Sequence, residues 1–170
     1  MQNPFRTPFQ TDAGEMNWIQ DNPAYQEFLM LHFAWAIAEF EGFFIPDSIS
    51  QRNNNPGNLR PIGSSTGFQQ FETPELGWER LLHQIRLNVK RGLTMTEFFL
   101  GKPGVYPGYA PLGDNDPEVM KNYIQFVKDR TGITDTFPLQ AFFQNLDVGS
   151  PEFAFSHRWP PKNRITTPNR

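Results

Sequence analysis

Apolar residues recur at spacings of three and four between residues 23 and 44, which is the pattern of an α-helix with one buried face. The stripe is formed by Leu29, Phe33, Ile37, Phe40 and Phe44 and is widened by Phe28 and Ala36. Gly42 follows the last turn, and Pro46 comes shortly after it. Because glycine suits the left-handed position after a helix and proline cannot continue one, we expect the helix to run from about Pro23 to Glu41.

Further helices are predicted where a capping side chain precedes an apolar stripe. The caps are Thr73, Thr94 and Asp116, and prolines at positions 74 and 117 occupy the first helical positions. The stripes comprise Trp78, Leu81, Leu82, Ile85 and Val89 in one segment and Val119, Met120, Tyr123, Ile124 and Val127 in another. We expect helices over residues 74–92, 94–100 and 117–132, with residues 138–146 closing the domain.

A small β-hairpin is expected between the first two long helices. Residues 58–62 and 67–71 are short segments that flank the turn-forming run Gly63-Ser64-Ser65-Thr66, as in a hairpin. The chain shows no internal repeat. The predicted fold class is therefore mainly α (α+β), a helical domain with one small β-hairpin.

Composition limits the domain count and the classes of function. The 170 residues suit one ordinary domain, and the 17 phenylalanines supply much of the apolar volume of its core. We expect an N-terminal arm (1–14), a domain over residues 15–148 and a Pro-rich basic C-terminal tail (149–170). The chain has no cysteine and three histidines without a close pair, so we expect no metal site and no cofactor.

Charge and hydropathy narrow the partners further. A formal net charge of −3 provides no broad basic surface, which argues against nucleic-acid binding. No apolar run reaches the roughly 18 residues that a membrane span needs, and the N-terminus lacks a charged-then-apolar signal. We therefore expect no membrane span, no signal peptide and synthesis in the cytoplasm.

Glu41 is the strongest candidate for chemistry because its position breaks a local rule. The negative end of the helix disfavours a carboxylate by up to about 1 kcal/mol, and the neighbouring phenylalanines reduce its hydration. Both effects raise a carboxyl pKa, as a general acid near neutral pH requires. The alternatives are a solvated helix-end carboxylate at this position, or Glu39 as the acid. Glu39 lies roughly 200° round the helix from Glu41, so both cannot face one cleft.

A set of short motifs extends from this glutamate through most of the chain. They are Ile37–Phe43, Gln51–Arg60, Gly67–Phe71, Gly77-Trp78, Gln84-Ile85, Tyr109–Pro111 and Asn122–Ile124. Together, over about residues 25–146, they resemble the lysozyme-like domains of phage virion and lysis proteins, within the broad lytic transglycosylase group. The resemblance implies a lysozyme-like fold and assigns the catalytic acid and base to Glu41. Typical members carry Glu-Ser and then Gly-Leu-Met-Gln, whereas this chain has Glu41-Gly42 and Gly57-Asn58-Leu59-Arg60.

The candidate substrate-binding residues are Ser50, Asn55, Asn58, Gln84, Tyr106, Tyr109 and Tyr123. The asparagines surround a Pro-Gly turn, where they either contact sugar hydroxyl and N-acetyl groups or brace the loop. Gln84 lies within an apolar helix, either at its edge or facing the cleft. The tyrosines at 106 and 109 either stack on sugar rings or cover the core. The spacing of Tyr123 is that of a core residue, and the resemblance implies that it orients the acid.

The expected reaction depends on the number of carboxylates. A hydrolysing glycosidase normally needs two, and Asp47, Asp114 and Asp116 are weak candidates for the second. With one glutamate, the resemblance implies a lytic transglycosylase that cleaves the MurNAc–GlcNAc bond with help from the substrate's N-acetyl group and closes a 1,6-anhydro ring. A hydrolytic muramidase (lysozyme) using the same Glu41 is one alternative. A non-catalytic virion or secretion-machine protein, structural or glycan-binding, is another.

The C-terminal stretch from about Gly149 differs in character from the rest. Its charged residues, Glu152, Arg158, Lys162, Arg164 and Arg170, give it a net charge of +3, and its prolines oppose regular structure. It is either a solvated or self-packing end or a tether to an anionic or protein partner. The expected partners are peptidoglycan glycan strands and, through the terminal tails, a virion or secretion-machine protein. We expect the chain to be virion-associated or exported to the periplasm or cell wall by another factor.

Overall fold

The computed structural model describes residues 13–144 except 65, 112 and 114, so residues 1–12 of the predicted arm and the whole predicted tail lie outside it. The described helices are α1 (Ala13–Gln20), α2 (Pro23–Phe40), α3 (Ile49–Arg52), α4 (Pro74–Val89), α5 (Met95–Leu100), α6 (Pro117–Thr131) and α7 (Leu139–Phe142). The prediction of a mainly helical chain is confirmed. Within the described residues, no helix combines the length and the apolar character that a bilayer crossing demands.

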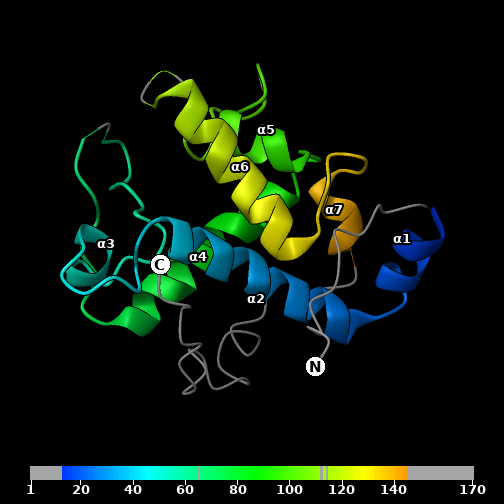
Figure 1. Cartoon of the computed structure of the whole chain (residues 1–170), viewed down its shortest axis with the longest axis horizontal. Helices are drawn as coiled ribbons and strands as arrows, with labels where there is room; N and C mark the ends of the chain where they lie inside the picture. The colour runs from blue at the N-terminus through cyan, green and yellow to red at the C-terminus, as the bar shows by residue number, and fades with distance from the viewer. Residues whose placement is uncertain (1–12, 65, 112, 114, 145–170) are drawn as a thin grey trace.

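The long helix α2 is the element on which most others pack. α6 and α4 pack against it, α1 packs near its start, and α7 packs on α1. Figure 1 shows α6 crossing α2, with α1 and α7 towards one end of α2 and α3 towards the other. Because neighbours surround α2, its buried apolar residues cover more than one face: Leu29, Met30, Phe33, Ala34, Ala36, Ile37 and Ala38. Phe28 and Phe44, which the sequence assigns to the buried stripe, are instead exposed.

The end of α2 follows from the residues directly after it. The helix ends at Phe40, and the N–H of Glu41 still donates to the carbonyl of Ile37 at 2.9 Å. Gly42 has a φ of 77°, the left-handed conformation expected there. The N–H of Phe43 then donates back to the carbonyl of Ala38 at 2.9 Å. The chain therefore turns sharply away and leaves Glu41 at the helix end.

Side-chain caps set the starts of α4, α5 and α6, as predicted. Thr73 and Asp116 accept hydrogen bonds from N–H groups of the first turns of α4 and α6, and Thr94 forms a capping box with Glu97. Helices α1 and α3 have no counterpart among the predicted elements. Their eight and four residues are too few to show a clear helical period.

The predicted β-hairpin is absent from the described residues of this region, so that prediction is wrong. The Asn55 side chain takes up the backbone groups that a ladder would use. Its Oδ1 accepts from the N–H of Leu59 at 2.8 Å, and its Nδ2 donates to the carbonyls of Leu59 and Gln69 at 2.9 and 2.8 Å. The N–H of Gln69 donates to the Leu59 carbonyl at 2.7 Å. An amide side chain thus bridges the two segments in place of strand pairing.

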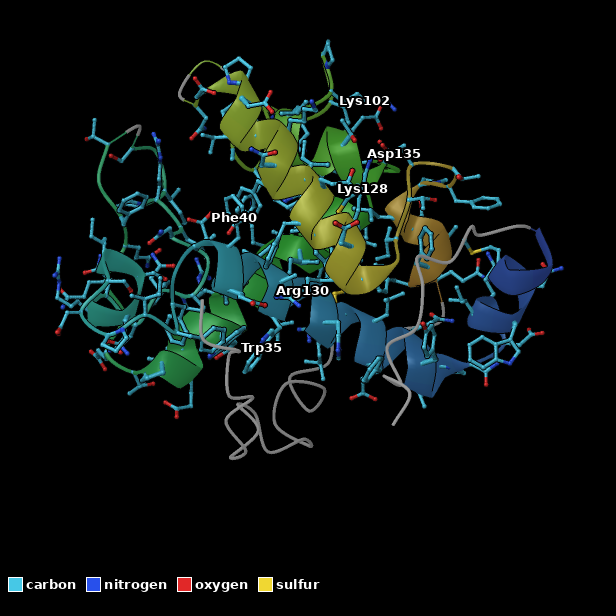
Figure 2. The ribbon with its side chains drawn as sticks, viewed as in Figure 1. Trp35, Phe40, Lys102, Lys128, Arg130 and Asp135 are labelled. Carbon is cyan, nitrogen blue, oxygen red and sulfur yellow. The ribbon has the colours of Figure 1, made fainter. Side chains whose placement is uncertain are left out.

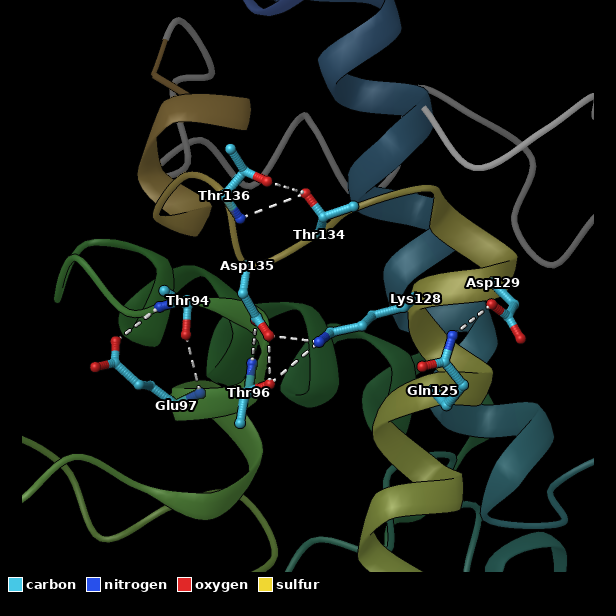
Figure 3. A network of polar contacts seen from close by, with 9 residues as sticks. All are labelled: Thr94, Thr96, Glu97, Gln125, Lys128, Asp129, Thr134, Asp135 and Thr136. Atoms are coloured by element: carbon cyan, nitrogen blue, oxygen red, sulfur yellow. Dashed lines mark hydrogen bonds and ion pairs between the residues drawn. The ribbon is translucent and has the colours of Figure 1, made fainter. Parts of the chain in front are cut away.

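A polar network joins α5 to α6 and to the segment after it (Figure 3). Asp135 accepts hydrogen bonds from the N–H and the hydroxyl of Thr96 at 2.9 and 2.7 Å. Lys128 forms an ion pair with the same carboxylate and donates to the Thr96 hydroxyl at 3.2 Å. Since Tyr123 lies on α6 and Tyr109 follows α5, this network fixes the two tyrosine-bearing segments relative to one another.

Gly77 sets how closely α4 approaches the loop after α3. A Cβ atom at this position would lie 1.8 Å from the carbonyl oxygen of Asn54 and 2.8 Å from Cδ of Pro56. Asn54 is itself held, because its Nδ2 donates to the carbonyl of Phe71 at 3.0 Å. A side chain at position 77 would therefore force a shift of the loop against this hydrogen bond.

We expect Gly77→Ala to destabilise the protein by about 1–3 kcal/mol, the scale of overpacking in a close-packed contact. The sign is informative because the same change in an open helix would stabilise by up to about 1 kcal/mol. Gly113→Ala is the control for a glycine outside a close contact, since nothing lies within 4 Å of its Cβ position. Urea denaturation of both variants measures the difference. Equal stability of Gly77→Ala and wild type would mean that the loop after α3 moves aside to accommodate the added Cβ atom.

Candidate active site

Glu41 lies where the end of α2, the middle of α6 and the loop after α3 meet. Its side chain is half-buried. The hydroxyl of Tyr123 donates to Oε1 at 2.8 Å, and Nδ2 of Asn58 donates to Oε2 at 2.9 Å. Each carboxylate oxygen therefore has its own donor, and the two donors come from different elements. The resulting group of Glu41, Asn58 and Tyr123 is called the carboxyl cluster below.

Opposing effects act on the protonation of Glu41. Burial raises the pKa of its carboxyl, and this effect outweighs the hydrogen bonds from Asn58 and Tyr123, which lower the pKa. The negative end of α2 favours the neutral form as well. The outcome is a carboxyl with a raised pKa that remains well supported when it ionises. Such a group can both give and accept a proton.

Tyr123 combines a core ring with a hydroxyl in the site. Its ring is buried and stacks on Phe40, with centroids 3.9 Å apart and planes 11° from parallel. Burial, followed by the charges of Glu41 and Tyr109, raises the pKa of Tyr123 well above its usual value, so the hydroxyl stays protonated as a donor. The ring therefore packs as the spacing predicts. Its hydroxyl also contacts the Glu41 carboxylate, and the orienting role that the resemblance implies stays a prediction.

Asn55 and Ser50 brace the loop that presents Asn58. Asn55 is fully buried, and its amide is occupied by backbone groups of the loop. The Ser50 hydroxyl is also buried and donates to the carbonyl of Asn55 at 2.7 Å. Of the two roles open for Asn55 from sequence, the structure displays bracing. Contact of either side chain with a ligand stays a prediction.

The other candidates lie in the segment after α5 and on α4. The hydroxyl of Tyr109 donates to the carbonyl of Gly57 at 2.5 Å, which ties this segment to the loop carrying Asn58. Tyr106 is buried, hydrogen-bonded to Gln84, and has the Arg91 guanidinium 5.1 Å from its ring centre. A hollow of about 520 Å³ is lined by residues 100–107, including Tyr106 but not Glu41. Tyr106 and Gln84 therefore form a pair of their own beside this hollow, outside the carboxyl cluster.

Glu39, the alternative acid, is paired with Arg130 and not with the carboxyl cluster. Its Oε1 lies 2.6 Å from Nη2 of Arg130, and this guanidinium also covers the ring of Phe126 at 4.9 Å. Figure 2 shows Phe40 and Arg130 on the crossing helices α2 and α6. Glu39 and Glu41 thus diverge around the end of α2, as the helical angle between them predicts. The sequence contained no signal for Arg130 as the partner, since the two residues are 91 positions apart.

The candidates for a second carboxylate are placed differently from Glu41. Asp116 caps α6, and Asp47 is exposed with a φ of 61°. Asp114 lies outside the described residues. Among the described residues, the pKa of Glu41 is shifted by burial, by Asn58 and by Tyr123, and by no other carboxyl. The same residues contain no group of three or more His, Cys, Asp or Glu side chains that could hold a metal ion.

Comparisons of the chain with protein-family models, with curated proteins and with solved structures give no match. A functional assignment therefore depends on the carboxyl cluster and on the motif resemblance in the sequence.

We expect Tyr123→Phe to raise the pKa of Glu41 further, because the change removes a hydrogen bond that favours the carboxylate while leaving the ring in place. A ¹³C NMR titration of the Glu41 carboxyl carbon measures the shift. Tyr106→Phe is the control, since this hydroxyl is hydrogen-bonded to Gln84, outside the carboxyl cluster. An unchanged or lowered pKa in Tyr123→Phe would contradict the hydrogen bond to Oε1.

Proposed function

We propose that this chain is a lysozyme-like, peptidoglycan-cleaving enzyme that breaks the glycosidic bond between N-acetylmuramic acid and N-acetylglucosamine as a lytic transglycosylase. The observation that carries the proposal is the carboxyl cluster: one half-buried glutamate with a raised pKa and a separate donor on each oxygen. The motif resemblance over residues 25–146 supplies the substrate. Glycan strands of peptidoglycan are the proposed partner, and the cell wall is the proposed place of action.

Glu41 acts first as the acid. Its carboxyl proton passes to the bridging glycosidic oxygen, and the electron pair of the breaking C1–O bond stays on that oxygen. The oxygen of the substrate's N-acetyl group bonds to C1 as the leaving sugar departs. The Glu41 carboxylate formed in this step is stabilised by Tyr123 and Asn58, whose hydrogen bonds favour the charged form.

Glu41 then acts as the base. It takes the proton of the C6 hydroxyl, whose oxygen attacks C1 and displaces the N-acetyl oxygen, which closes a 1,6-anhydro ring. This route needs a single protein carboxylate, whereas hydrolysis ordinarily needs a second one at a defined separation. The divergence of Glu39 towards Arg130 and the capping role of Asp116 favour the single-carboxylate route.

We expect Glu41→Gln to fold like the wild type but to lose at least about 10²-fold of its activity, the scale of a lost general acid. Turbidity clearing of purified peptidoglycan measures this. Glu39→Gln is the matched control, because it makes the same chemical change two residues away on a side chain paired with Arg130. Clearing by Glu41→Gln at the wild-type rate would remove Glu41 from the mechanism. Absence of clearing by folded wild-type protein would favour a structural or glycan-binding role.

We expect mass spectrometry of the released muropeptides to show 1,6-anhydro ends, because the C6 hydroxyl replaces water as the nucleophile. The control is a digest of the same peptidoglycan by a hydrolytic muramidase, which leaves reducing ends. Reducing ends in the products of this protein would identify it as a hydrolase that uses the same Glu41.

A further inference from the structure

The two polar atoms of the Asn58 amide differ in their hydrogen bonding. Nδ2 donates to Oε2 of Glu41 at 2.9 Å. Oδ1 is closed to solvent and has no hydrogen-bond partner in the described part of the chain. Buried polar atoms are nearly always hydrogen-bonded, so each exception needs a physical explanation, of which a catalytic role is one. The unused oxygen sits on the same amide that contacts the candidate acid.

The backbone holds this amide in place. Asn58 has a φ of 45°, in the left-handed region, and its N–H donates to the carbonyl of Asn55 at 3.0 Å. A Cβ atom at the preceding Gly57 would lie 2.5 Å from the Tyr109 hydroxyl and 2.8 Å from Leu81 Cδ1, so the loop is close-packed there. The backbone at Asn58 is therefore held, and rotation about the Cβ–Cγ bond is the movement that changes which end of the amide faces Glu41. A half-turn about that bond exchanges Nδ2 and Oδ1.

The two donors to Glu41 differ in what they can do when the carboxyl gains a proton. The Tyr123 hydroxyl has one hydrogen, which it gives to Oε1. An amide, in contrast, carries both donors and an acceptor of nearly equal size. A protonated Oε2 facing Nδ2 would set two donors against each other, whereas a protonated Oε2 facing Oδ1 would form a hydrogen bond. Asn58 can therefore match both forms of Glu41.

We propose that Asn58 turns its amide by half a rotation as Glu41 gains or loses its proton, so that the transferable proton resides on Oε2. In the ionised form Nδ2 donates to Oε2, and in the acid form the Oε2 hydroxyl donates to Oδ1. The turn exchanges one hydrogen bond for another: Nδ2 gives up its contact with Oε2, and Oδ1, which has no partner in the described residues of the ionised arrangement, gains one. Asn58 is thus a positioning residue for the proton, while Tyr123 anchors Oε1 in both forms.

The tyrosines next to Glu41 do not change their protonation when Glu41 titrates. The titratable groups facing Glu41 are Tyr123 from α6 and Tyr109 from the segment after α5, and burial first of all raises the pKa of both. Both therefore stay neutral across the range in which Glu41 titrates. Glu39 forms an ion pair with Arg130. Asn58 is consequently the neighbour that responds when Glu41 changes its charge.

The consequence for catalysis rests on the proposed function. During bond cleavage, a bridging oxygen of the substrate takes the place of Oδ1 as acceptor of the Oε2 proton. The amide then turns back and donates to the carboxylate that remains. The same residue would hold the proton before the step and stabilise the anion after it.

Neutron diffraction of deuterated crystals tests the turn directly, at one pH below and one above the pKa of Glu41 measured by NMR. We expect a deuteron on Oε2 pointing to Oδ1 at low pH, and Nδ2 deuterons pointing to Oε2 at high pH. In Glu41→Gln, the Tyr123 hydroxyl should hold Oε1 and leave Nε2 as a permanent donor towards Asn58, so Oδ1 should face residue 41 at both pH values. Nδ2 facing Oε2 in wild type at both pH values would overturn the proposal. This measurement needs no activity, so its result is independent of the reaction assigned to the protein.

A variant of the same shape gives the kinetic counterpart. Asn58→Asp keeps an acceptor but loses the donor and repels ionised Glu41, so we expect kcat to fall about tenfold and the alkaline limit of activity to move to higher pH. Asn122→Asp, an exposed change of the same kind on α6, should leave the pH profile unchanged. An unshifted profile in Asn58→Asp would overturn the proton-holding role. It would leave the Glu41→Gln result, and with it the proposed function, unaffected.

Discussion

The stacking of Phe40 on Tyr123, where α2 and α6 cross, is the contact on which the site depends. The two rings lie nearly parallel, with centroids 3.9 Å apart, and Phe99 packs on the same tyrosine with centroids 4.7 Å apart. These contacts bury the apolar faces of both helices, and they also bring the Tyr123 hydroxyl to Oε1 of Glu41, one residue after Phe40. Packing, desolvation of the carboxyl and its first hydrogen bond therefore have one cause. Displacing either helix would disturb all three together.

The cluster balances two opposing requirements. Burial favours the neutral carboxyl, which a proton donor needs, while the donors on its two oxygens favour the anion that remains after donation. Either effect alone would fix Glu41 in one state. The loop after α3 contributes the second donor only because Asn55, Ser50 and Tyr109 hold that loop through its backbone. Side chains that never contact the carboxyl thus determine its chemistry.

The loop after α3 shows which features could be predicted from the sequence and which could not. The asparagine-rich run predicts a turn, and the residues at 54 and 58 do adopt left-handed backbone angles. The hairpin expected beside it is wrong, because the buried Asn55 amide binds the backbone of Leu59 and Gln69 where a ladder was expected. Whether an asparagine side chain turns inward depends on what covers the loop. That covering comes from α4 and Tyr109, which are distant in sequence.

The sequence by itself determined the features that depend on neighbouring residues: the helical class, the caps at Thr73, Thr94 and Asp116, the left-handed Gly42 after α2 and the exceptional position of Glu41. Each results from hydrogen bonds or backbone angles within a few positions, which a local pattern records. Only the tertiary structure decided that Tyr123 reaches Glu41 across 82 positions and that Arg130 takes Glu39 across 91. Those pairings depend on the angle and depth at which α6 crosses α2. Side-chain packing over the whole domain sets that crossing, and no local pattern encodes it.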